Sequence, residues 1–234
     1  MNKFIKACKI GDVEKVKRLL PSVNPSARDN LAIHWASEYG HVEVVRLLLT
    51  DSRVDPSGYP IEMASMNGHI KVVHLLLADK RVDPSDCNNC AIRCASMNGH
   101  VEVVRLLLTD SRVDPSASNI IGCACREGHI EIVRLLLARV DPSDNHNWAI
   151  RIASDGGHVE VVRLLLTDSR VCPSDYDDFA IRWASLNGHV DVVKLLLQDS
   201  RVDASYAKSD KPEIKELLAQ WKYHPTSQKN DIYF

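Results

Sequence analysis

The sequence predicts an all-α protein built as a helical-repeat solenoid. The first observation is a stretch that recurs along almost the whole chain, in the form Gly157-His158-Val159-Glu160-Val161-Val162-Arg163-Leu164-Leu165-Leu166. The second is its spacing, because Gly-His pairs stand at 40/41, 68/69, 99/100, 128/129, 157/158 and 188/189, which are 28 to 31 residues apart. A period of this length is typical of a solenoid, in which neighbouring units bury a core that one unit cannot bury alone.

Each unit reads as two short helices and a loop, and the first helix covers residues such as 30–37 and 178–185. It carries an isoleucine and, three positions later, an alanine that we expect to face the core (Ile33/Ala36, Ile61/Ala64, Ile92/Ala95, Ile121/Ala124, Ile150/Ala153 and Ile181/Ala184). We interpret the polar column before the first apolar position as an N-cap (Asn30, Asn89, Ser118, Asn147 and Asp178). A glycine then ends the helix in a left-handed conformation.

The second helix carries two consecutive Val or Ile residues and then three leucines. Its opposite side holds charge pairs spaced i, i+3, which predict a solvated back face (Glu43/Arg46, Glu102/Arg105, Glu131/Arg134, Glu160/Arg163 and Asp191/Lys194). The sequence Arg-Val-Asp-Pro-Ser follows at 53–57, 81–85, 112–116 and 139–143. Its Pro and Ser indicate a turn into a short hairpin-like loop.

We expect one domain of about seven helix pairs and a truncated C-terminal capping unit. The solenoid covers residues 1–222, and a polar C-terminal tail covers residues 223–234. The expected repeat helices lie near 2–20, 31–50, 59–78, 90–109, 119–138, 148–167 and 179–198, with the partial cap at 205–222. Charged residues at both ends solubilise the open faces of the stack, as terminal repeats require.

Composition excludes several classes of protein. The 234 residues are 45% hydrophobic and carry 29 basic against 31 acidic side chains, without the clustered basic face of a nucleic-acid binder. Lys3, Lys6 and Lys9 interrupt the apolar residues of the N-terminus, so no signal peptide or membrane span is drawn there. Seven cysteines without a repeated paired spacing fit a reducing compartment. We expect a cytoplasmic monomer that binds no nucleic acid, no membrane and no cofactor.

The unit of two helices and a loop, with Gly-His-x-Glu-Val-Val-x-Leu-Leu-Leu, resembles the ankyrin repeat over nearly the whole chain. The Thr-Pro-Leu-His signature of that family is replaced by forms such as Phe179-Ala180-Ile181-Arg182, and His remains only at His34. The units are also shorter than is usual in the family. The Asp-x-Arg-Val-Asp-Pro-Ser variety resembles ankyrin families expanded in large DNA viruses and protists, which would imply the host cytoplasm if the chain is viral.

Histidine and cysteine raise the question of a metal. Stacked helices lie ~8–10 Å apart, whereas zinc ligands lie ~2.0–2.1 Å from the ion, so we assign the Gly-His histidines a structural role at the junction of the two helices. The spacing Cys87-x-x-Cys90-x-x-x-Cys94 permits zinc or a thiol relay. However, Cys90 stands in the column of Leu31 and Cys94 in that of Trp183, and we interpret these columns as packing positions. A small-ligand or metal-binding module at Cys87, Cys90 and Cys94 is kept as the alternative function.

No motif for catalysis is present. We find no Gly-rich phosphate loop, nucleophile elbow or carboxylate pair that a cleft would hold. The acidic loop residues Asp144 and 175–178 either pair with Arg151 and Arg182 or are solvated, and we favour pairing. The prediction is that the protein is not an enzyme.

The positions that vary between repeats are those that the stacking of the repeats does not constrain. In ankyrin arrays such columns line the concave face, formed by loop tips and first helices, and contact partner proteins. The resemblance therefore implies a non-enzymatic scaffold or adaptor, unless these columns vary by drift alone. The candidate partner-binding residues are Glu38, Tyr39, Met66, Met97, Arg126, His146, Trp148, Asp155, Tyr176, Asp177 and Leu186.

Overall fold

The computed structural model describes residues 2–116 and 119–223. These residues form fifteen α-helices and one short 3-10 helix, and they contain no β-strand. The predicted all-α repeat fold is confirmed, because seven helix pairs are followed by a single last helix. Ser118 of the proposed N-cap column and residues 224–234 of the predicted tail lie outside the described residues.

Contacts divide the chain into two compact units, residues 1–120 and 121–234. The first unit holds α1 (Lys3–Ile10), α2 (Val13–Leu19), η1 (Leu20–Ser22), α3 (Ala27–Glu38), α4 (Val42–Leu49), α5 (Tyr59–Met66), α6 (Ile70–Leu77), α7 (Asp86–Met97) and α8 (Val101–Leu107). The second holds α9 (Ile120–Arg126), which starts at the boundary, and α10 (Ile130–Leu137), α11 (Asp144–Asp155), α12 (Val159–Leu166), α13 (Asp175–Asn187), α14 (Val190–Leu197) and α15 (Pro212–Tyr223). A single continuous domain over residues 1–222 stays a prediction.

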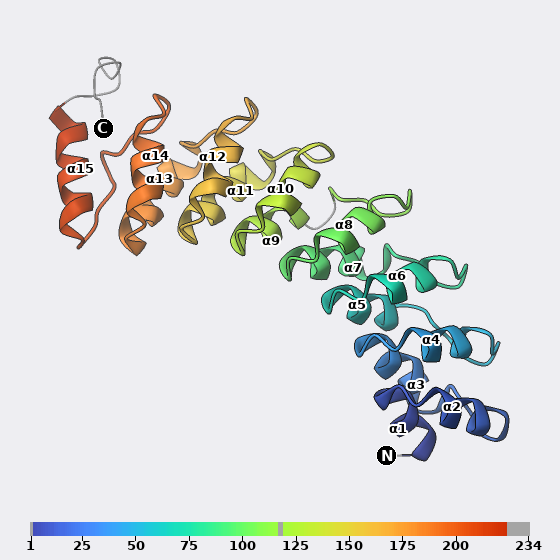
Figure 1. Ribbon diagram of the computed structural model, residues 1–234. Helices are drawn as coiled ribbons and strands as arrows, with labels where there is room; N and C mark the ends of the chain where they lie inside the picture. The colour runs from blue at the N-terminus through green and yellow to red at the C-terminus, as the bar shows by residue number, and fades with distance from the viewer. Residues whose placement is uncertain (1, 117–118, 224–234) are drawn as a thin grey trace. The chain divides into compact units, whose positions relative to one another are not determined.

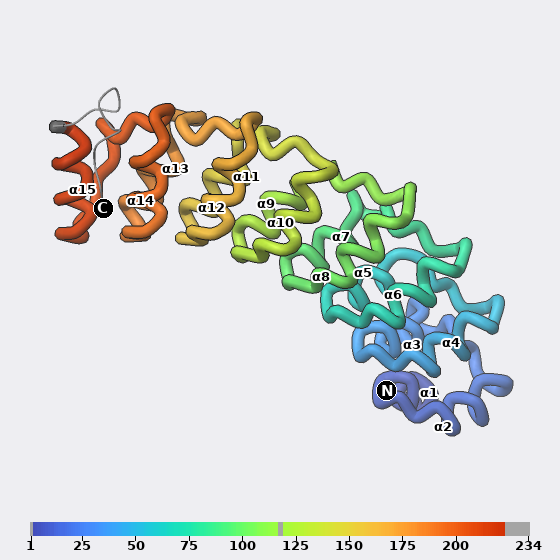
Figure 2. Tube along the Cα trace, turned by 45° about the horizontal axis from the view of Figure 1, so that its top comes forward, coloured from blue at the N-terminus to red at the C-terminus, as the bar shows by residue number. Residues whose placement is uncertain are grey.

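Within each unit the helix pairs stack in chain order and form two layers (Figures 1 and 2). First helices contact first helices, as in α1, α3, α5 and α7, and second helices contact second helices, as in α10, α12 and α14. Every isoleucine and alanine of the two predicted core columns is buried. The small alanines thereby allow adjacent first helices to approach closely.

A contact between glycine and histidine joins successive repeats. Gly40 has φ +72°, and a Cβ added to it would lie 2.6 Å from Nδ1 of His69 in the next repeat. His69 Nε2 donates a hydrogen bond of 2.9 Å to the carbonyl oxygen of Glu38, at the end of the preceding first helix. The predicted structural role of the Gly-His histidines is therefore confirmed. The hydrogen bond, however, joins the histidine to the preceding repeat and not to the first helix of its own repeat. The same arrangement pairs His41 with Gly11, His100 with Gly68, His158 with Gly128 and His189 with Gly157.

A lysine takes the place of this histidine in the last repeat. Lys211 Nζ donates a 2.6 Å hydrogen bond to the carbonyl oxygen of Gly188. Its side-chain carbons occupy the space beside Gly188 where a histidine ring lies in the other repeats, 2.5 Å from the position of an added Cβ. Lys211 thus closes the stack at its C-terminal end, beyond the solubilising role that the sequence indicated.

The interpretation of the asparagine column as an N-cap is wrong. Asn30, Asn89, Asn147 and Asp178 have positive φ and end a run of three left-handed residues near the start of α3, α7, α11 and α13. Their side-chain oxygens accept hydrogen bonds from backbone N–H groups 25 residues later, in the next loop (Asp55, Asp114, Cys172 and Asp203). The column therefore links loops of neighbouring repeats. Asn and Asp suit it because they tolerate the left-handed conformation best among residues with a side chain.

The loops are held by an arginine that the sequence analysis did not single out. Arg53 binds both carboxylate oxygens of Asp51, at 2.9 and 2.6 Å, and its Nη1 donates to the carbonyl oxygen of Val23 at 3.0 Å. These hydrogen bonds lower the pKa of the Asp51 carboxyl to about 2. The same pattern recurs at Arg81, Arg112, Arg170 and Arg201. The Asp-x-Arg element is thus a clamp between adjacent loops, which turn without strand pairing in the described residues.

The predicted back-face charge pairs form in part. Three Glu–Arg pairs occur at 3.4 to 3.5 Å on exposed second-helix surface (43/46, 102/105 and 160/163). Lys194 does not pair with Asp191 but with Glu213 of α15, at 2.8 Å. The pair expected between Glu131 and Arg134 is not among the ion pairs of the described residues. Exposed pairs of this kind contribute little to stability, so the stack depends on the buried contacts instead.

We predict that Gly40→Ala destabilises the protein by more than the backbone cost alone. An alanine at positive φ costs about 1–2 kcal/mol, and here its methyl group would also displace the His69 ring. In a double-mutant cycle with His69→Ala, measured by urea unfolding, Gly40→Ala should cost less once the ring is absent. Equal costs in both backgrounds would contradict the proposed contact.

We also predict an acid-dependent contribution from the clamp. Because the pKa of Asp51 is lower in the folded chain than in the unfolded chain, its stabilising effect is fully present above about pH 4. It is lost as the pH falls toward 2. The difference in urea midpoint between wild type and Asp51→Asn should shrink over this range, and a difference that persists unchanged at pH 2 would contradict the assignment.

Candidate protein-interaction surface

The structure places the sequence-predicted binding residues near the two ends of first helices. Tyr39, Met66, Met97, Arg126, His146, Tyr176, Asp177 and Leu186 are exposed, and Glu38, Trp148 and Asp155 are half-buried. Asp155 already has internal partners, because its carbonyl oxygen accepts from His189 and its carboxylate accepts from Asn187 at 2.7 Å. Four of the eleven residues lie in the first unit and seven in the second.

Large exposed hydrophobic side chains are concentrated on this side of the helix pairs. Nearly all of them lie on first helices or in the loops that follow second helices. Among the described residues the exceptions are Tyr39, which directly follows α3, and Ile70, at the start of α6. The others are Ile10, Tyr59, Met66, Met97, Tyr176, Trp183, Leu186 and Tyr206. We call the side of each unit that carries them the first-helix face.

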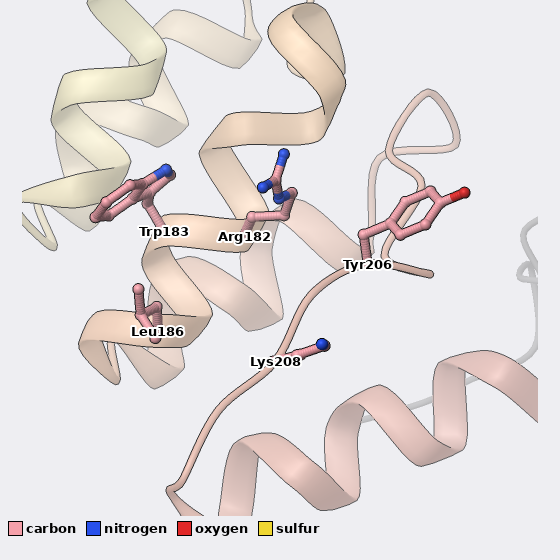
Figure 3. Close-up of a pocket in the computed structure, with 5 residues that line it drawn as sticks. All are labelled: Arg182, Trp183, Leu186, Tyr206 and Lys208. Carbon is pink, nitrogen blue, oxygen red and sulfur yellow. The ribbon is translucent and has the colours of Figure 1, made fainter.

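The second unit has a pocket on this face. It has a volume of about 180 Å³ and is lined by Arg182, Trp183, Leu186, Tyr206 and Lys208. Arg182, Trp183 and Leu186 project from α13, and Tyr206 and Lys208 come from the chain segment that leads to α15 (Figure 3). Trp183 is 38% exposed, Leu186 60% and Tyr206 73%. The pocket therefore combines apolar walls with two cations.

The pocket exists because the last repeat lacks a first helix. Residues 198–211, between α14 and α15, form no α-helix, so α13 has no first helix on its C-terminal side. The interpretation of the Trp183 column as a packing position is therefore wrong at this repeat. Sequence reasoning missed Trp183, although the deleted helix was visible in the sequence and signals an uncovered neighbour.

A buried arginine lies beside the pocket within an aromatic cluster. The guanidinium carbon of Arg151 is 4.2 Å from the ring centroid of Tyr176, 4.8 Å from that of Phe179 and 5.1 Å from that of Trp148. The cluster continues from Phe179 to Trp183, whose rings stack with centroids 5.2 Å apart. Cation–π contacts of this geometry are favourable. The predicted residues Trp148 and Tyr176 are thus brought together around a cation, and His146 stands next to Tyr176 with ring centroids 6.2 Å apart.

The pairing that we favoured between the acidic loops and these arginines is wrong. Neither Arg151 nor Arg182 forms an ion pair in the described part of the chain, and Arg182 donates to the carbonyl oxygen of Asp177 at 3.2 Å. Asp175 accepts instead from Asn147 at 3.0 Å, and this hydrogen bond is the main cause that lowers the pKa of its carboxyl. Burial raises the pKa of Asp178.

The first unit has a smaller aromatic cluster. Lys9 Nζ lies 3.9 Å from the ring centroid of Trp35, which stacks on Tyr39 with centroids 5.7 Å apart. His34 contacts Tyr59, with ring centroids at 4.9 Å, and burial lowers the pKa of this histidine. These rings extend the first-helix face of that unit.

The described residues give no support for a metal site at the cysteine cluster. Cys90 and Cys94 have their sulfur atoms 3.6 Å apart, and Cys87 is exposed near the start of α7. Burial raises the pKa of the Cys94 thiol to about 12, and a hydrogen bond to Glu62 raises that of Cys87. Within residues 2–116 and 119–223, no three His, Cys, Asp or Glu side chains converge as a metal would require. Metal ligation needs thiolates, so this environment opposes it.

Comparison with known proteins identifies the repeats. A family model described as ankyrin repeats (3 copies) matches residues 4–59, 61–146 and 121–210. The chain belongs to the ankyrin-repeat family. Ankyrin repeats are in general protein–protein interaction modules, typically without enzymatic activity. A comparison with curated proteins gives no match.

Solved structures support the ankyrin fold. The crystal structure of the human ASB11 ankyrin repeat domain is similar with a TM-score of 0.58 and 20% sequence identity, over 77% of this chain and 96% of that domain. At this level of identity the likeness concerns the fold. Within the described ranges, no helix is both long enough and apolar enough to cross a lipid bilayer.

We predict that the purified protein binds no stoichiometric zinc. After incubation with zinc chloride under reducing conditions and desalting, elemental analysis should find far less than one equivalent, because the thiols at Cys90 and Cys94 face each other without a third ligand. The control variant is Cys172→Ser, in the second unit. One equivalent that persists in this control and disappears in Cys87→Ser would contradict the prediction.

Proposed function

We propose that the protein is a non-enzymatic adaptor that holds a partner protein on its first-helix face. The observation that carries the proposal is the distribution of exposed hydrophobic side chains, which gather on that face and almost avoid the second helices. Clustered apolar and aromatic surface is typical of interaction sites, and Trp and Tyr are the residues most enriched at their energetic centres. The ankyrin family, whose repeats serve as interaction modules, supports the same function.

The second unit offers the stronger site. Its exposed side chains Trp183, Leu186 and Tyr206 line the pocket together with two cations, Arg182 and Lys208. Tyr176 is exposed as well, and it contacts Phe179, whose ring stacks on Trp183. A rigid scaffold supports them, since α13 is fixed to α11 and α14 by buried contacts. Aromatic anchors on a rigid element bind with a small loss of conformational entropy. We place the centre of partner binding at Tyr176, Trp183, Leu186 and Tyr206. Three of the four are aromatic, and we call them together the aromatic surface.

The proposal predicts the outcome of affinity capture with quantitative mass spectrometry. Full-length wild type should recover a partner protein from a lysate, and Tyr176→Ser/Trp183→Ser/Leu186→Ser should lose it. Truncation of central anchors typically costs about 2 kcal/mol or more each, so the combined loss should abolish recovery. Both proteins are first shown to fold by circular dichroism.

A matched control uses the equivalent side of the first unit. Tyr39→Ser/Met66→Ser/Met97→Ser removes the same number of exposed apolar side chains. This variant should retain the partner. If it loses the partner and the variant of the second unit retains it, the binding site lies in the first unit and our placement is wrong.

A further inference from the structure

Arg151 is a buried cation without a polar partner. It is only 7% exposed, yet it forms no hydrogen bond or ion pair in the described residues, and its Nε is enclosed without an acceptor. Arginine is rarely buried to this extent unless it is paired. Because removing a guanidinium from water is costly, an enclosed and unpaired one calls for an explanation beyond stability.

We propose that Arg151 is the anchor for an acidic side chain of the partner protein. The inference depends on the proposed function and specifies the chemistry of the partner. A carboxylate matches the planar guanidinium, which binds two oxygens at once. The rings of Trp148, Tyr176 and Phe179 hold the guanidinium in place before binding. A donor that is already desolvated and oriented gains more from its acceptor than a flexible surface arginine does.

Access to the guanidinium is on the side of Tyr176. Only Nε is both enclosed and without a partner, whereas the two Nη nitrogens form no hydrogen bond within the described ranges and are not among the enclosed atoms, so they keep some of the remaining exposure. Tyr176 is itself 58% exposed and stands in the left-handed run near the start of α13, at φ +58°. Its ring is the exposed wall of the aromatic cluster. A carboxylate therefore approaches at this wall, next to His146 of the preceding repeat.

The charges around Arg151 leave it available. Asp175 is near enough for its pKa to respond to Arg151, but the carboxylate is bound to Asn147 and to the backbone N–H of Tyr176. Asp178 accepts from the backbone of Asp203 and Asp177 is exposed. Asp144, at the start of α11, forms no ion pair with Arg151. These carboxylates repel an acidic ligand, so binding requires that the ligand carboxylate reach Arg151 directly.

The neighbouring pocket indicates what accompanies the acidic residue. Trp183, Leu186 and Tyr206 provide apolar walls, while Arg182 and Lys208 add positive charge at its edge. A segment with acidic residues and a large apolar side chain fits both features. We therefore infer that the ligand is an acidic, partly apolar peptide segment of a protein.

The test selects random peptides displayed on phage against the immobilised full-length protein. We expect the selected peptides to be enriched in Asp and Glu beside an apolar residue. The binding constant of a synthetic selected peptide is then measured with each variant. Arg151→Gln should weaken binding at least about thirtyfold, the loss expected when one member of a buried charge pair is removed. Arg151→Lys, which keeps the charge without the two-pronged geometry, should give an intermediate loss.

Two controls separate binding from folding. Arg93→Gln makes the same change in the same column of the first unit and should weaken binding less than about fivefold. Arg151→Met should keep or raise the urea midpoint while it abolishes acidic selectivity, because a buried unpaired charge does not favour the free fold. A lowered midpoint with unchanged selectivity would show that Arg151 serves only the fold and would overturn the inference.

The selection also distinguishes the two proposals. Peptides that lose binding on Trp183→Ser but show no acidic enrichment would overturn the role of Arg151 and leave the proposed surface intact. Recovery of no peptide sensitive to either Arg151→Gln or Trp183→Ser would overturn both the proposed function of this surface and the inference that depends on it.

Discussion

The contact between a histidine ring and the glycine of the preceding repeat is the constraint on which the stack depends. The glycine must turn in the left-handed region to end the first helix, and it must also lack a Cβ because the ring occupies that space. The histidine then donates to the last carbonyl oxygens of the same helix, as His69 does to Glu38. A Gly-His pair such as Gly40-His41 thus contacts two neighbouring repeats, since its glycine receives the ring of His69 from the next repeat and its histidine packs on Gly11 of the previous one. At the last glycine of the series, Gly188, Lys211 takes the place of the histidine and donates a hydrogen bond to the glycine carbonyl oxygen.

The parts of the fold that repeat could be predicted from the sequence. The isoleucine and alanine columns, the left-handed glycines and the single last helix follow from periodicity, because a position that recurs in every unit has the same neighbours in every unit. Patterning also indicated that Tyr176 and Leu186 face away from the core. Positions that the stacked helices leave exposed follow from the repeat pattern, so the local sequence is enough to identify them.

The parts that depend on distant partners could not be predicted in this way. The asparagine column looked like an N-cap because Asn suits both positions, and only the fold shows that Asn30 bonds a loop 25 residues later. The Asp-x-Arg clamp was hidden for the same reason, since Arg53 reaches Val23 across a whole repeat. Trp183 was misplaced because its column is packed in other repeats and loses its neighbour only where the last first helix is missing. Arg151 was expected to pair with acidic loops whose carboxylates the backbone and Asn147 already use.

These observations separate the residues that build the stack from those available to a partner. The measurement that tests this separation most directly is a scan of all single substitutions in the full-length chain, with protease resistance as the readout of folding. The account predicts that the glycine, histidine and alanine columns tolerate few substitutions, whereas Tyr176, Trp183, Leu186 and Tyr206 tolerate polar residues without loss of resistance. If polar substitutions in this aromatic surface reduce resistance as much as those at Gly40 or Ala95, the surface belongs to the fold, and the claim that it is reserved for binding is wrong.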